Sequence, residues 1–75
     1  MFKSQVEAKL AKNIKKCIRK SGLKQYVVAE RAGIRGGHLS DMLNGRKEIK
    51  VMYIPSLANA LKVTPNQLIG YDSIE

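Results

Sequence analysis

The glycines divide this chain into short segments, and no other feature constrains its fold as strongly. Six of the 75 residues are glycine, at positions 22, 33, 36, 37, 45 and 70. Glycine readily adopts the left-handed conformation that ends a helix. Between these stops, apolar residues recur at steps of three and four, the period of a helix that buries one face. The sequence therefore predicts a compact all-α domain of five helices without a strand.

The first two segments carry helix signals at both ends. Ser4 and Glu7 form a capping box, in which Ser4 accepts from the Glu7 amide and Glu7 reaches back to the Ser4 amide. Gly22 ends this first helix, and its predicted apolar stripe consists of Val6, Leu10, Ile14, Cys17 and Ile18. A short second helix is predicted over residues 25–32, with Gly33 as its stop.

A third helix is predicted near residues 36–43, ending at Asn44-Gly45. Its start is poorly specified, because glycine is about 1 kcal/mol less favourable than alanine inside a helix. The third helix therefore begins either at Gly36 or, if the two glycines lengthen the preceding turn, at His38.

Two prolines mark the remaining helices. Pro55 either opens a fourth helix in its first turn or interrupts an earlier one, and we favour a helix that ends at Leu61. The stretch Thr64-Pro65-Asn66-Gln67 combines an N-cap threonine, a proline at the first helical position and a glutamine at the third. It predicts a last short helix through Ile69.

Positive charge is concentrated in the first two thirds of the chain. Lys and Arg number 14 against 6 Asp and Glu, a formal net charge of +8. Residues 1–50 hold 13 of these bases and 4 of the acids, a net +9 that leaves −1 for residues 51–75. Such a field attracts polyanions, so nucleic acid is the leading partner and an anionic membrane surface the second.

The composition argues against several other classes of protein. A chain of 75 residues forms one domain, residues 1–75, with a small core and no room for a ligand-sensing domain, so we expect no small-molecule effector and no cofactor. One Cys and one His cannot build a metal site, and we place Cys17 in the core. We expect no catalysis, because His38, Ser40 and Asp41 lie too close together on one helix to form a triad. No signal peptide or membrane-spanning run is visible, so a cytoplasmic protein is expected.

The second and third helices form a helix-turn-helix candidate over residues 25–43. Ala29 allows the two helices to approach closely, and Gly33 permits the sharp turn between them. Ile34 and Leu39 fill the angle. One face of the third helix then remains free to enter a major groove.

Further sequence blocks extend this unit in order along the chain: Gly22-Leu23-x-Gln25, residues 28–34, Leu39-Ser40, residues 43–46 and residues 57–68. With these blocks the chain resembles the lambda-repressor-like, Cro/C1-type (XRE-like) helix-turn-helix family over residues 14–69, leaving residues 70–75 as a short tail. The resemblance implies a five-helix domain that binds double-stranded operator DNA, usually as a symmetric dimer, with the third helix as recognition helix.

The resemblance, together with the charge pattern, assigns candidate roles. Candidates for reading bases are Arg35, Gly36, Gly37, His38, Ser40 and Asp41. Candidates for contacting the DNA backbone are Lys24, Gln25, Tyr26, Asn44, Arg46 and Lys47. The two glycines depart from the family pattern, since they offer no side chain to a base, and Asp41 could accept only from a cytosine amine. We therefore expect binding to depend on the DNA backbone, and hence on salt, more than is usual for the family.

The chain is accordingly predicted to be a small transcriptional regulator, a repressor that occupies a near-palindromic operator. Near-neutral residues at the C-terminal end suit a subunit contact, with Ile69, Tyr71 and Ile74 as candidates. The alternative is an antitoxin or another protein-interaction module built on the same helices. A third reading, a membrane-surface peptide, is less favoured because the apolar residues of the basic first helix are needed in the core.

Overall fold

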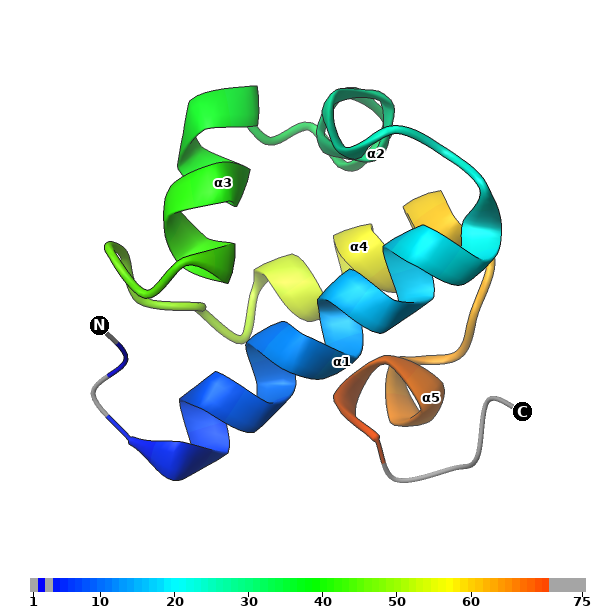
Figure 1. Cartoon of the computed structure of the whole chain (residues 1–75). Helices are drawn as coiled ribbons and strands as arrows, with labels where there is room; N and C mark the ends of the chain where they lie inside the picture. The colour runs from blue at the N-terminus through cyan, green and yellow to red at the C-terminus, as the bar shows by residue number, and fades with distance from the viewer. Residues whose placement is uncertain (1, 3, 71–75) are drawn as a thin grey trace.

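The computed structural model describes Phe2 and residues 4–70, and these residues form five α-helices without a strand. The helices are α1 (Gln5–Ser21), α2 (Gln25–Ala32), α3 (Gly36–Leu43), α4 (Tyr53–Leu61) and α5 (Pro65–Ile69). The long helix α1 packs against α3 and α5, while α4 packs against α2 and α5 (Figure 1). The predicted all-α, five-helix architecture is confirmed.

The helix boundaries follow the local signals in the sequence. Gly22 and Gly70 end α1 and α5 in the left-handed conformation, with φ of 76° and 88°. Before α5, the side chains of Thr64 and Gln67 each accept from the other residue's amide, so the predicted capping box is complete. Pro55 lies in the first turn of α4, where its missing N–H leaves no helical bond unmade.

The first capping box is only half formed. Ser4 Oγ accepts from the Glu7 amide at 3.1 Å, as predicted. The predicted return bond from Glu7 to the Ser4 amide is wrong, because Glu7 Oε2 accepts instead from the amide of Ile49 at 2.9 Å. Ile49 lies outside the helices and its amide needs a partner in this half-buried place, which the glutamate supplies. The bond ties the start of α1 to the loop between α3 and α4.

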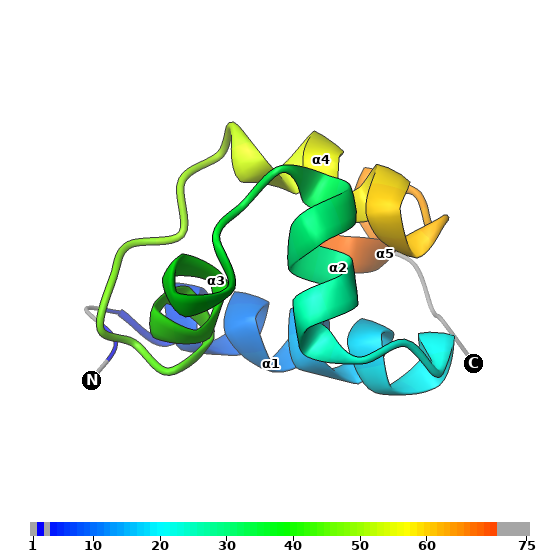
Figure 2. The same cartoon turned by 90° about the horizontal axis from the view of Figure 1, so that it is seen from above.

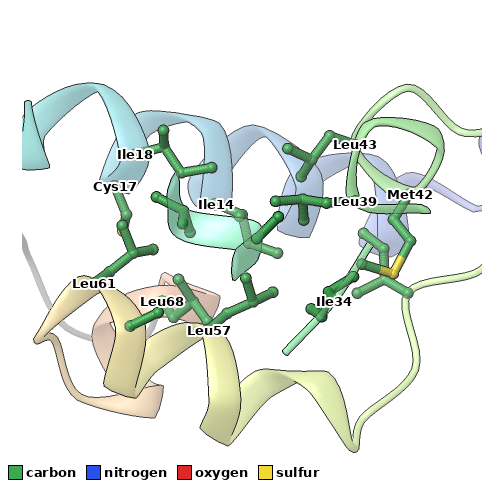
Figure 3. Packing of buried hydrophobic residues seen from close by; sticks show 14 of the residues in the cluster. Ile14, Cys17, Ile18, Ile34, Leu39, Met42, Leu43, Leu57, Leu61 and Leu68 are labelled. Carbon is green, nitrogen blue, oxygen red and sulfur yellow. The ribbon is translucent and has the colours of Figure 1, made fainter. Parts of the chain in front are cut away.

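The core is apolar and draws on all five helices. Figure 3 shows Ile14 of α1 near Leu39 of α3, with Leu57 of α4 and Leu68 of α5 close by, and all four side chains are fully buried. Ile34, in the turn before α3, is also buried. This core fixes the position of α2 and α3 on the rest of the domain.

One member of the predicted apolar stripe does not belong to the core. Val6 is 79% exposed, and the buried stripe of α1 begins at Ala11. Each step of four residues turns the helix about 40° beyond a full turn, so the two steps back from Ile14 place Val6 about 80° away from the buried face. The placement of Val6 in the core was therefore wrong.

Candidate nucleic-acid interface

A tight turn at Gly33 joins α2 to α3. Gly33 adopts φ of 72°, and the Ile34 amide donates to the carbonyl of Ala29 at 2.9 Å, which closes the end of α2. Ala29, Ile34 and Leu39 are all buried where the two helices meet. Figure 2 shows α2 from the side and α3 nearly end-on, so their axes cross steeply. The structure confirms the helix-turn-helix predicted over residues 25–43.

The first turn of α3 presents little side chain to solvent. The helix begins at Gly36, which decides against the alternative start at His38. Neither Gly36 nor Gly37 has a positive φ, and a β-carbon built on either would meet no atom within 4 Å. The packing inside the domain therefore does not require glycine at these positions. Arg35 precedes them as an exposed residue, and its side chain makes no cap bond to α3.

His38 is half-buried and lies against α4. Its ring meets that of Tyr53 edge to face, with the ring centroids 5.4 Å apart and the planes at 76°. Tyr53 was absent from the sequence candidates, because nothing in the local pattern connects the first residue of α4 with the third helix. The contact packs His38 of α3 against the first residue of α4.

The end of α3 brings base-reading candidates into contact with backbone candidates. Asn44 Nδ2 donates to the carbonyl of Ser40 at 2.8 Å, and Arg46 Nε donates to Asp41 Oδ1 at the same distance. The Asp41 carbonyl also accepts from the amides of Arg46 and Lys47. Ser40 and Asp41 therefore organise the loop that follows the helix.

The remaining backbone candidates lie at the start of α2. Lys24 occupies the N-cap position, followed by Gln25 and Tyr26 as the first two helical residues. All three side chains are exposed, as are Asn44, Arg46 and Lys47 after α3. Two exposed groups of candidates thus lie at the ends of the helix-turn-helix, one at the start of α2 and one after α3.

Residues 14–68 match a protein family described as helix-turn-helix. The chain belongs to this helix-turn-helix family. The match covers most of the chain and nearly coincides with the stretch 14–69 that carries the Cro/C1-type resemblance, which it confirms. A search of curated protein sequences finds no match.

Solved structures show the same helix-turn-helix fold. The restriction-modification controller protein C.AhdI from Aeromonas hydrophila is similar over 81% of this chain and 88% of its own, with 23% identity and a TM-score of 0.76. The clp gene regulator ClgR from C. glutamicum is similar over 97% of this chain and 100% of its own, with 19% identity and a TM-score of 0.78. At these low sequence identities, the similarity shows a shared fold and nothing more.

The helix-turn-helix domain has an apolar hollow on its surface, where the first turns of α1 meet the end of α5. It has a volume of about 420 Å³ and is lined by Val6, Lys9, Leu10, Ile69 and Gly70. Ile69, a predicted dimer contact, is 40% exposed there. The other two candidates, Tyr71 and Ile74, lie outside the described residues. The sequence pattern placed Val6 in the core, but its exposed side chain lines this hollow together with Ile69.

Cys17 is buried, and this burial raises the pKa of its thiol, partly offset by Lys16 and Lys20. Within residue 2 and residues 4–70, no three His, Cys, Asp or Glu side chains gather in a way that could hold a metal ion. No helix in the described part of the chain is long and apolar enough to cross a membrane.

Proposed function

We propose that the chain is a cytoplasmic, sequence-specific transcriptional repressor that places α3 in the major groove of a near-palindromic operator. The observation that carries the proposal is the exposed start of α3 on a helix-turn-helix whose inner face is buried in the core, with exposed basic residues before α2 and after α3. In this proposal the regulator acts by occupying the operator, without a small-molecule effector.

The proposed contacts divide into two kinds. Lys24, Arg46 and Lys47 are exposed cations that neutralise phosphates, and each such contact releases counterions from the DNA. The exposed Gln25, Tyr26 and Asn44 add hydrogen bonds to the same backbone.

Base reading falls to few side chains. Arg35 has the guanidinium fork that pairs with guanine, and the half-buried His38 is a second candidate for a hydrogen bond to a base. Gly36 and Gly37 bring bare backbone close to the groove, and Ser40 is a lesser candidate beside them. The proposed specificity therefore rests mainly on Arg35.

This division can be tested with two arginine variants. Operator sequences are first selected from random duplex DNA with the wild-type protein, and affinities for a selected and a scrambled duplex are then measured by fluorescence anisotropy over a range of salt. Arg46→Ala should weaken binding to both duplexes equally and flatten the salt slope by about one unit per protomer, or about two units for the proposed dimer. Arg35→Ala should lose about 1–3 kcal/mol on the selected duplex and much less on the scrambled one.

Lys12→Ala provides the control, because Lys12 is an exposed base on α1 outside the helix-turn-helix. Its affinity and salt slope should stay close to those of the wild type. Equal weakening of the two duplexes by Arg35→Ala would remove the base-reading role of Arg35. A wild-type protein that enriches no sequence from the random pool would refute the proposed function as a whole.

We further propose that the repressor binds as a homodimer through the hollow between α1 and α5. Two half-sites one helical turn apart require two recognition helices, and a second copy of the chain supplies the other one. The hollow is the apolar surface at which Ile69, Val6 and Leu10 meet. Its walls come from both ends of the described chain.

A matched pair of exposed valines tests this interface. Val6 and Val51 are 79% and 83% exposed, and only Val6 lines the hollow. Val6→Asp should lower the dimer fraction in light scattering and weaken binding to a two-half-site operator, because it places a charge in the proposed apolar contact. Val51→Asp should leave both unchanged. Equal behaviour of the two variants would rule out this surface as the dimer contact.

A further inference from the structure

We infer that Asp41 is a positioning residue, which holds Arg46 toward the DNA backbone and reads no base itself. The inference rests on the proposed function, since it concerns how the domain meets DNA. Asp41 lies on α3 among the base-reading candidates, and in this inference it acts on Arg46 instead of on a base.

The carboxylate of Asp41 is already paired with Arg46 in the protein without DNA. Arg46 Nε donates to Asp41 Oδ1 at 2.8 Å, and the two side chains are 61% and 33% exposed. Nε is one of five N–H donors of the guanidinium, which form a rigid planar fork. Within residues 4–70 the structure records no partner for the Nη groups of Arg46. They are therefore available to bind a phosphate while Nε remains on Asp41.

The backbone holds Arg46 to the same residue. The carbonyl oxygen of Asp41 accepts from the amide of Arg46 at 2.8 Å and from that of Lys47 at 3.2 Å. Arg46 is thus fixed at both its main chain and its side chain. Ordering a long side chain opposes binding through lost rotamer freedom, and a side chain ordered beforehand loses less on contact.

Electrostatics favours this role over base reading. A carboxylate without a partner is repelled by the phosphates that line the groove, and it could pair only with a cytosine amine. Paired with Arg46, the charge of Asp41 is compensated locally. The arrangement explains how an acid is compatible with DNA binding on this helix.

A double-mutant cycle on DNA binding tests the inference. Asp41→Ala, Arg46→Ala and the double variant are compared with the wild type on a selected and a scrambled duplex over a range of salt. Asp41→Ala alone should weaken binding to both duplexes about three- to fivefold, in line with an exposed ion pair, and flatten the salt slope by up to one unit per protomer. In the Arg46→Ala background the same change should cause no loss, or a slight gain, because only the repulsion from phosphate is then removed.

Different results would contradict the positioning role of Asp41 and the proposed repressor function. Relaxed preference at one base pair after Asp41→Ala, whether or not Arg46 is present, would show that Asp41 reads a base and would overturn the inference. An unchanged salt slope would overturn it as well. A wild-type protein without sequence preference would instead refute the proposed function. Asp41→Leu removes the acceptor at similar side-chain size and gives the same comparison if the alanine variant melts below the assay temperature.

Discussion

Ile14→Ala should lower the free energy of unfolding by about 2–5 kcal/mol, because it leaves a cavity at a fully buried position of α1. A domain of this length has a total stability of only about 4–11 kcal/mol, so the loss is a large part of the whole. The midpoint of thermal unfolding should fall by at least about 10 °C. Urea titration followed by circular dichroism measures the change.

Val6→Ala is the control within the same helix. Although the sequence pattern places both residues on one stripe, Val6 is exposed and its truncation should change the free energy of unfolding by no more than about 0.5 kcal/mol. Similar losses for the two variants would contradict the orientation of α1 described above. A small loss for Ile14→Ala would mean that the core can collapse around the missing atoms.

Raising the salt concentration should weaken DNA binding far more than any single substitution. Each protomer offers three cations in the proposed backbone contacts, Lys24, Arg46 and Lys47, so a dimer neutralises about six phosphates. The logarithm of the association constant should then fall with the logarithm of salt at a slope near −5. Between about 50 and 200 mM salt the affinity should decrease about a thousandfold. Anisotropy titrations on a selected duplex provide the slope.

The same salt titration on a scrambled duplex tests whether backbone contacts dominate binding. Because the proposed base reading involves few side chains of α3, the slope should be nearly the same on both duplexes, and the affinities should differ mainly by the contribution of Arg35. A decrease of tenfold or less over the same salt range would contradict the dominance of backbone contacts. In that case the specificity would come from groups other than the ones proposed above.

Features that depend on neighbouring residues could be predicted from the sequence. The Thr64 cap, the stop at Gly33 and the short α5 each follow from the preferences of residues within one turn of a helix. The helix-turn-helix followed for the same reason, since Ala29, Gly33 and Ile34 act locally. The candidates before α2 and after α3 came from the same local blocks.

Features that depend on the approach of distant segments could not be predicted. Glu7 meets Ile49 across 42 positions of the sequence, and a capping-box pattern gives no sign of a competing partner. His38 meets Tyr53 only because the fold brings the first residue of α4 to the third residue of α3. The pairing of Asp41 with Arg46 spans only five positions, but it depends on how the loop turns after Leu43, which the sequence pattern does not specify.

The bond between Glu7 and Ile49 has a consequence for hydrogen exchange. The Ile49 amide belongs to no helix, yet its hydrogen is held by a side chain from the first turn of α1. Its protection against exchange with solvent therefore requires that turn to stay folded. A single loop amide thus reports how often the N-terminal end of α1 opens, and fraying there also releases the segment that follows α3.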